Sequence, residues 1–507
     1  MPRPELLPWL LLVIPSLAAL LCALTRSPRR TLLYAWLGVF LAAGTGGLSA
    51  LQVFTHGTLV AGAGWLRVDA LSAYHLIVMD LVFAASSIYG HIYFGEELRS
   101  GRLEAPQARR LAALWCSALA AMTGVLVSND LGLMWVSMEA TTLFTAFLIS
   151  LHASERSLEA MWKYILICSI GVAFAFLGTL LFSAAYSQVG FEAGQPMFWT
   201  ALRADAGALD PSLAKLAFVF ILVGYGTKAG LAPVHNWLPD AHSQAPAPVS
   251  AIFSGFMLNA ALYCIMRYLP IAELATGNVG WAQHLVGGFG LLSIAVAAAF
   301  ILFQRDLKRL LAYHSVEHLG IIAVGLGLGG LGAFAALFHT LNHSLCKALA
   351  FFAAGRLGQR YGGYDMERMN GALWVSRVWG VAILASMLAL VGMAPFALFM
   401  SEFQIVWAAV QAGAYTTMTL FLLGAGIVFA GAISHVIPLV FGRAPSDVRR
   451  LRTSVLEWVL VGVPLAVLLG LGLDMPAGLQ AALHQAAALI DPVGAATASL
   501  AAAGGLP

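Results

Sequence analysis

The sequence predicts an all-α polytopic membrane protein with fourteen transmembrane helices. Hydrophobic residues make up 60% of the 507 residues and charged residues only 10%, whereas an ordinary soluble domain carries about 25% charged residues. The apolar residues gather into runs of roughly 20 residues, the length that crosses a bilayer as a helix. The basic residues concentrate in alternate connections between these runs. This pattern excludes a large soluble enzyme.

The predicted spans cover residues 5–25, 31–54, 69–94, 110–127, 131–151, 157–186, 212–232, 247–269, 279–303, 307–327, 331–355, 376–411, 415–441 and 455–474. The first is interpreted as a retained helix, because it lacks a clear small-residue cleavage site and a second span follows at once. The run 376–411 is too long for one simple crossing, and Gly392 and Pro395 are expected to break it. The Ala-rich tail after residue 475 is expected to fray or to lie along the surface.

The orientation follows from the distribution of Lys and Arg. The connections after odd-numbered spans hold 19 of the 27 basic residues: Arg26, Arg29, Arg30, Arg99, Arg102, Arg109, Arg110, Arg156, Arg305, Lys308, Arg309, Arg356, Arg360, Arg368, Arg377, Arg443, Arg449, Arg450 and Arg452. The positive-inside rule then places these connections in the cytoplasm and both termini on the non-cytoplasmic side.

Several kinds of site are not expected. The five cysteines lie singly in apolar stretches without a CxxC pair, which argues against iron–sulfur and zinc centres and against disulfides. There is no glycine-rich phosphate loop after a strand and no basic tract, so neither a nucleotide nor a nucleic acid is an expected partner. The chain is predicted to bind no cofactor and no metal.

Ionisable residues inside or beside apolar runs are the strongest functional signal. A charge at the bilayer centre costs roughly 2.5–3.5 kcal/mol on insertion scales, so such residues mark ion paths by default. The candidate path, interpreted as a path for protons, consists of Glu139, Lys228, His339, His343, Lys347 and Glu402.

The segment 226–251 is the most specific one. Lys228 lies in a helix that is followed by four prolines and several polar groups. Non-helical backbone at membrane depth is tolerated where it lines a cavity or is buried in protein, and a broken helix beside a lysine is a transporter device. The alternative is a proline-rich cytoplasmic loop, with Lys228 reaching back to the membrane surface.

His339, His343 and Lys347 stand at i, i+4 and i+8, which places them on one face of a helix. Histidine exchanges a proton at cellular pH, so this row could carry protons across half a membrane through water. The alternative is a polar seam bonded to carbonyls of neighbouring helices. A metal site is less favoured, because no carboxylate or cysteine stands at matching spacing in this segment.

Two carboxylates complete the proposed path. Glu139 lies in mid-span, and Lys228 is its predicted partner. Glu402 follows the expected break at Pro395. A lysine before one break and a glutamate after another suggest two halves of opposite sense, as inverted repeats produce.

Five further residues are possible members of the path. His314, Glu317 and His318 begin a helix, and the two histidines either feed protons inward or serve the structure. Lys163 either reaches the cytoplasmic surface, the favoured interpretation, or balances Glu139. The fifth residue is Asn259, whose amide can hold a water but cannot take up a proton at neutral pH.

At this point the chain resembles a known family. MWVSMEATTL, GTKAGLAPVHNWLPDAHSQAPAPVSA, DLKRLLAYHSVEHLG, FHTLNHSLCKALAF and SEFQIVW are similar, in order and spacing, to segments of the antiporter-like subunits of respiratory complex I. That family includes multisubunit sodium/proton antiporters and energy-converting hydrogenases. SLEAMWKYILICSIG and HSVEHLG resemble most closely the component F type of hydrogenase-4 and formate hydrogenlyase complexes.

The resemblance implies an organisation and roles. It implies two inverted five-helix repeats, helices 4–8 and 9–13, with helices 7 and 12 broken. The units are then residues 1–109, 110–270, 271–442 and 443–507. It also implies that Glu139 and Lys228 interact, that the row on the eleventh helix is a central axis, and that Glu402 ends the second half. Asn259 stands where some members carry lysine, which puts a continuous path from Lys228 to Lys347 in doubt.

The predicted function is that of a proton-translocating subunit of a membrane-bound redox complex of the hydrogenase-4 or NADH-quinone oxidoreductase type. Other membrane subunits, and through them peripheral redox subunits, are the expected partners in a bacterial or archaeal inner membrane. Two alternatives remain: a subunit of a cation/proton antiporter or inorganic-carbon uptake complex without redox partners, and a scaffold whose charges only fix helix packing.

Overall fold

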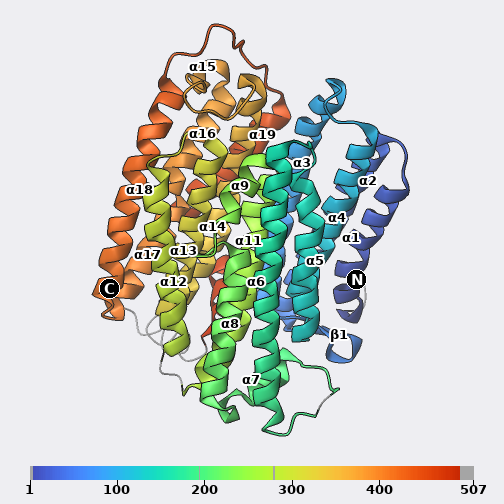
Figure 1. Ribbon diagram of the computed structural model, residues 1–507, viewed down its shortest axis with the longest axis vertical. Coiled ribbons are helices and arrows are strands. Elements are labelled where there is room, and N and C mark those ends of the chain that lie inside the picture. Colours follow the sequence, from blue (N-terminus) through green and yellow to red (C-terminus); the bar gives the residue numbers. More distant parts are fainter. Residues whose placement is uncertain (1–3, 193, 278–279, 492–507) are drawn as a thin grey trace.

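The computed structural model describes residues 4–192, 194–277 and 280–491. It is a bundle of long helices lying nearly parallel to the long axis of the molecule (Figure 1). The first part comprises η1 Pro4–Leu6, α1 Leu7–Leu24, α2 Pro28–His56, β1 Leu59–Ala61, η2 Gly62–Gly64, β2 Leu66–Val68, α3 Ala70–Arg99, α4 Ala105–Val127, α5 Leu131–Ile149 and α6 Glu155–Ser187.

The middle of the chain comprises α7 Trp199–Ala204, η3 Ala206–Ala208, α8 Pro211–Ala229, α9 Trp237–Gln244, α10 Ala247–Ile252, η4 Phe253–Met257, α11 Leu258–Ala275, α12 Trp281–Ile301, α13 Leu307–Leu328 and α14 Leu331–Tyr361. The η4 segment is one turn of π-helix that joins α10 to α11 without a break. The last part comprises α15 Ala372–Val375, α16 Arg377–Leu390, α17 Ala397–Gln411, α18 Tyr415–Phe441, α19 Val455–Leu473 and α20 Ala477–Ile490.

Twelve helices in the described part of the chain are long and apolar enough to cross a membrane, counting α10–α11 as one. The prediction of fourteen spans differs at two places. The predicted span 331–355 is the 31-residue helix α14, whose row of buried polar side chains makes it less apolar than the others. The predicted span 376–411 is two shorter helices, α16 and α17, of 14 and 15 residues.

Both expected helix breaks are present. Helix α8 ends in a left-handed glycine, Gly230 at φ 79°, and α9 begins only at Trp237. Helix α16 ends at Leu390 and α17 begins at Ala397, with Gly392 at φ 65° between them. A positive φ favours glycine because a Cβ atom crowds the backbone there.

The ends of the bundle carry structure that the hydrophobic runs did not predict. Strands β1 and β2 pair antiparallel in the connection between α2 and α3. Of the two expectations for the tail, fraying was wrong over residues 477–490: α20 is a helix that packs against α3, α11 and α14. Its buried residues Leu483, Ala486, Ala487 and Ile490 follow the i, i+3, i+4, i+7 pattern of an apolar face. The rest of the tail lies outside the described residues.

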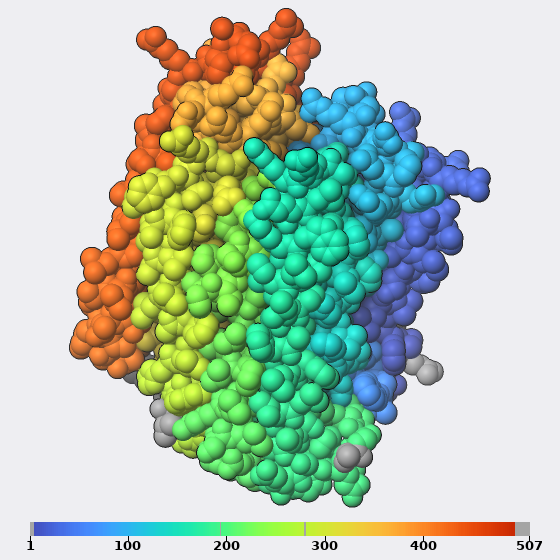
Figure 2. Space-filling model, viewed as in Figure 1, coloured from blue at the N-terminus to red at the C-terminus, as the bar shows by residue number. Residues whose placement is uncertain are grey.

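The inner helices are α10–α11, α13 and α14, whose side chains are buried over almost their whole length. The outer helices expose apolar side chains, as lipid-facing helices do. On the face shown in Figure 2, α6 in teal and α12 in yellow-green cover the inner helices, and green residues of the middle of the chain appear between them. The candidates on α13 and α14, and Asn259 on α11, therefore lie on the best-shielded helices, whereas Glu139, Lys228 and Glu402 lie on α5, α8 and α17.

Candidate functional site: a buried polar line

Helix α14 holds the centre of the site. His339, His343 and Lys347 are fully buried, and so is Asn342 one residue before His343. The helix packs against α3, α10, α13, α16 and α17, so its polar face meets protein rather than lipid.

The first cluster joins α5, α6 and α8. The Lys228 ammonium donates hydrogen bonds to Thr142 Oγ1 at 2.9 Å and to the Tyr164 hydroxyl at 2.5 Å. Thr142 Oγ1 in turn donates to Glu139 Oε2 at 3.4 Å, and Ser169 Oγ donates to Glu139 Oε1 at 2.7 Å. Among the described residues, Lys228 and Glu139 form no direct ion pair; Thr142 connects them. The predicted pair is thus brought together through a hydroxyl that sequence reasoning missed.

The end of α8 determines where the lysine points. The Trp237 indole N–H donates to the Thr227 carbonyl at 2.8 Å, and the Trp237 ring packs on the Tyr164 ring with centroids 4.9 Å apart. Because α8 stops at Ala229, the next segment leaves the axis and Lys228 faces the hydroxyls of α5 and α6.

His242, on α9, is a member of the line that sequence reasoning missed. Its ring is fully buried, stacks on Phe351 at 5.2 Å and lies 6.0 Å from the Phe253 ring. Neither ring nitrogen has a hydrogen-bond partner within the described residues. The available signal was its position in the proline-rich segment 226–251. Phe253 also stacks on Tyr164 at 6.1 Å, so an aromatic ring separates the first cluster from His242.

The second cluster joins α13, α14 and α17. His318 Nδ1 and His339 Nε2 lie 2.9 Å apart, and His339 Nδ1 lies 2.8 Å from Ser401 Oγ. Ser401 donates to the Leu398 carbonyl at 2.9 Å, so it accepts from His339 Nδ1–H. The lone pair of His339 then faces His318, and Glu402 offers a carboxylate oxygen within 4.8 Å of both histidines.

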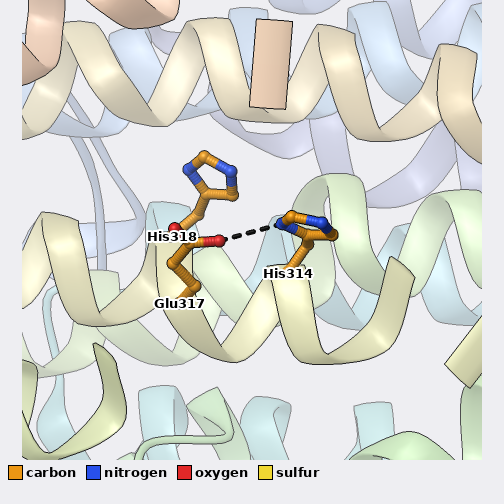
Figure 3. Close-up of side chains that lie close together, drawn as sticks. All are labelled: His314, Glu317 and His318. Atoms are coloured by element: carbon orange, nitrogen blue, oxygen red, sulfur yellow. Dashed lines mark hydrogen bonds and ion pairs between the residues drawn. The ribbon is translucent and has the colours of Figure 1, made fainter. Parts of the chain in front are cut away.

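The remaining candidates on α13 lie next to this cluster. His314 Nδ1 lies 2.9 Å from Glu317 Oε2, one turn along the same helix. Figure 3 shows this pair along α13, while the His318 ring extends away from α13 toward a neighbouring helix. Lys347 donates to the backbone carbonyl of Leu311 on α13. Residues of α13 and α14 are therefore joined by two separate contacts, His318 with His339 and Lys347 with the Leu311 carbonyl, and the His343 ring lies 5.2 Å from the His318 ring.

Asn259 lies at the inner edge of this network without joining its charged members. Its amide donates to Ser344 Oγ at 3.0 Å and to the Gly255 carbonyl at 3.1 Å. A nearby contact between the hydroxyls of Ser254 and Ser315, 2.7 Å apart, links the π-helical turn to α13. The hydroxyls of Ser254, Ser315 and Ser344 and the amide of Asn259 thus occupy the stretch where some members of the family that the chain resembles carry a lysine.

Lys163 lies apart from the line. Its side chain is exposed and pairs with Glu159 at 2.6 Å and with Asp240 at 3.1 Å. Arg309 also pairs with Asp240. These residues line a charged surface cavity of about 370 Å³ beside α9. The ammonium therefore belongs to a surface cluster and does not balance Glu139.

Comparison of the sequence with known proteins identifies the family of this chain. Residues 128–428 match the transmembrane family described as NADH:quinone oxidoreductase/Mrp antiporter. The chain belongs to this family. The matched range includes Glu139, Lys228, the α14 row and Glu402, so both clusters lie within the part that defines it.

Individual relatives agree with this assignment. The Hydrogenase-4 component F homolog of Methylacidiphilum infernorum is 37% identical over 389 residues, which cover 76% of this chain and 81% of that protein. Hydrogenase-4 component B of Escherichia coli is 32% identical over 394 residues, which cover 74% of this chain but only 54% of that protein. This antiporter-like chain therefore spans about half the length of component B.

Solved structures share the fold. A chain of the membrane-bound sulfane sulfur reductase, an archaeal respiratory membrane complex, superposes with a TM-score of 0.86 at 22% identity and covers 97% of this chain and 99% of its own. A chain of the Mrp complex from Dietzia gives a TM-score of 0.85 at 21% identity, with 99% and 100% covered. The resemblance drawn from the sequence motifs is thereby confirmed.

Proposed function

We propose that this chain is a proton-translocating, antiporter-like subunit of a membrane-bound redox complex of the hydrogenase-4 or NADH-quinone oxidoreductase type. The observation that carries the proposal is the buried hydrogen-bonded connection Lys228–Thr142–Glu139, together with the histidine network on α13 and α14. The chain's curated relatives include hydrogenase-4 components and a protein named NADH-quinone oxidoreductase subunit N.

The two carboxylates stand at opposite ends of the polar line. Glu139 is half-buried between α5 and α6, beside the exposed apolar side chains Val136 and Ile170. Glu402 is half-buried on α17, beside the exposed Phe403. In Figure 1, α17 lies toward the left edge of the bundle and α6 runs down the middle of the view. Each end therefore meets an apolar face where a partner membrane subunit could dock and change the charge that the carboxylate senses.

In this mechanism the Lys228 ammonium and the Glu139 carboxylate attract each other through the Thr142 hydroxyl that lies between them. A change of charge on the partner subunit beside Glu139 alters the attraction between Glu139 and Lys228, because charges act strongly on one another in a medium of low dielectric constant. Lys228 then releases its proton toward the histidine network, and a proton taken up by Glu139 passes through the Thr142 hydroxyl to replace it. Water is required near Phe253, where an aromatic ring and not a polar group separates the first cluster from His242.

The proposed organisation has two inverted repeats, residues 110–270 and 271–442, between residues 1–109 and 443–507. It is supported by the like construction of the two breaks, Gly-X-Ala-Pro at 230–233 and at 392–395, each with its glycine at positive φ. In this scheme α14 and the broken pair α16–α17 are added to the twelve apolar spans, which gives fourteen crossings. They are the eleventh and twelfth crossings along the chain. The basic connections face the cytoplasm of a bacterial or archaeal cell.

Lys228→Ala and Glu139→Gln test the function. Each variant is expected to assemble into its complex and to retain electron transfer, while losing proton translocation measured with a pH-sensitive dye in proteoliposomes. An unchanged proton-to-electron stoichiometry in both variants would contradict the proposal. Loss of assembly in both would favour the scaffold alternative.

A transport function without redox partners is the second candidate. The favouring observation is similarity to the Dietzia Mrp complex and to a probable K(+)/H(+) antiporter component of Rhizobium meliloti, 28% identical over 80% of this chain. Cation-dependent proton flux by the purified complex, in the absence of any electron donor, would support this candidate and not the first.

A further inference from the structure

The second cluster has the composition of a site for a transition metal. His318 on α13, His339 on α14 and Glu402 on α17 each offer one ligand atom, and these atoms lie within 4.8 Å of one another. His314, Glu317 and His318 form an overlapping group with the same property. The sequence argued against a metal because no carboxylate stands at matching spacing near the α14 histidines. The fold supplies Glu402 from another helix.

The spacing of the two imidazoles suits a shared ion. Zinc binds histidine nitrogen at about 2.0–2.1 Å in tetrahedral sites, which places two such nitrogens roughly 3.3 Å apart. His318 Nδ1 and His339 Nε2 are 2.9 Å apart. A small separation of the rings would admit the ion, provided that the His318 proton moves from Nδ1 to Nε2, and Ser401 already holds His339 so that its Nε2 lone pair points into the cluster.

His343 lies next to His318, His339 and Glu402, outside the group whose ligand atoms are within 4.8 Å of one another. The His343 ring lies 5.2 Å from the His318 ring, is fully buried, and has no partner on either nitrogen within the described part of the chain. A buried polar group without a partner carries a desolvation penalty. Coordination of a metal after a rotation of the ring would satisfy one of the two His343 nitrogens.

The donor set selects the kind of ion. Imidazole nitrogens favour zinc, copper and nickel, whereas magnesium and calcium require sets of oxygen ligands. We infer that His318, His339 and Glu402, with His343 beside them, form a binding site for a divalent transition metal of the zinc class. The ion ties α13, α14 and α17 together.

Metal binding has a consequence that rests on the proposed function. An ion between His318 and His339 occupies the nitrogen lone pairs through which this part of the network would pass protons. Zinc is therefore an inhibitor of proton translocation that acts inside the bundle, and the site is one where ion and proton compete.

Direct binding tests the site without any turnover. Zinc is titrated into the purified full-length protein in competition with a chromophoric chelator, after long equilibration to allow entry. The expected result is one tight site that His339→Asn and Glu402→Gln each weaken by at least roughly 10-fold to 100-fold. Cobalt substituted at the same site should give the visible absorption bands of a four-coordinate ion.

His484→Asn is the matched control, because His484 packs on Phe334 at 4.5 Å and lies outside both ligand groups. Equal zinc affinity in wild type, H339N and E402Q would overturn the proposal, whatever proton translocation does. Should one of these variants fail to fold, the cobalt spectrum of the wild-type protein still decides: an octahedral, all-oxygen signature refutes the site. K228A tests the two proposals separately: intact zinc binding in this variant supports the metal site, whether or not proton translocation is lost.

Discussion

The hydroxyl of Thr142 is expected to be essential for proton exchange between Lys228 and Glu139. The two legs of the connection are 2.9 Å and 3.4 Å, so the Lys228 Nζ and Glu139 Oε2 atoms are at most about 6.3 Å apart. Proton transfer requires heavy atoms about 2.6–3.2 Å apart, so the Lys228–Thr142 leg is already short enough and the Thr142–Glu139 leg must shorten by a few tenths of an ångström. Without the Thr142 hydroxyl, a proton could pass between Lys228 and Glu139 only if a water molecule took the place of that hydroxyl.

Thr142→Val removes the hydroxyl and nearly preserves the shape of the side chain. Lys228 keeps its hydrogen bond to Tyr164, so the ammonium stays in place. Positioned proton donors and acceptors contribute roughly 100-fold or more to the rate of a proton transfer, so we expect proton translocation to slow by about that factor while electron transfer in the partner subunits continues.

The assay is dye-detected acidification of proteoliposomes that contain the complete complex, with electron transfer recorded in the same sample. Thr142→Ser keeps the hydroxyl and is expected to translocate protons at nearly the wild-type rate. If T142V and T142S behave alike and both match the wild type, Thr142 does not connect the two charged groups, and the reasoning from this geometry is wrong.

Two further predictions concern stability and the second break. The buried Arg267 guanidinium donates to both carboxylate oxygens of Asp69 at 2.7 Å. Asp69→Asn removes this counter-charge and should lower the free energy of unfolding by about 3–5 kcal/mol. Denaturant titration in detergent measures the change. Burial alone would raise the pKa of Asp69, but Arg267 lowers it to about 2; this stabilisation is therefore present above about pH 4 and is lost as the pH falls toward 2. Gly392→Ala should reduce both assembly and proton translocation, because Gly392 has a φ of 65° and an added Cβ would lie 2.2 Å from Glu402 Oε2.

Each of these has a matched control. Asp130 caps α5 as Asp69 caps α3, but it forms no salt bridge among the residues that the structure describes; Asp130→Asn should change stability much less, and equal losses would contradict the ion-pair argument. Gly44→Ala, at a site with no heavy atom within 4 Å of the new Cβ, should leave assembly intact. A G392A variant that translocates protons like G44A would show that the break tolerates a side chain.

The sequence predicted the features that depend on local pattern: the membrane helices, the polar face of α14 and the break between α16 and α17. Hydrophobic run length predicts membrane helices because each apolar stretch must span the same bilayer. Helical periodicity placed His339, His343 and Lys347 on one face, and the buried row on α14 confirms that placement. The glycine and proline at 392–395 predicted the break between α16 and α17. The tail helix α20 was missed because its short apolar face falls below the length of a membrane span.

Contacts between helices far apart in the chain were decided only by the tertiary structure. Thr142 has no local signature that separates it from other hydroxyls in membrane helices, yet packing of α5 against α6 makes it the connection to Lys228. Packing likewise brings Glu402 to His318 and His339. The sequence by itself determined which charges enter the membrane, because their cost is a property of each residue and its run. Which of them meet was decided by the fold, because a hydrogen bond requires atoms within about 3 Å, and only the packing of the helices sets distances that short.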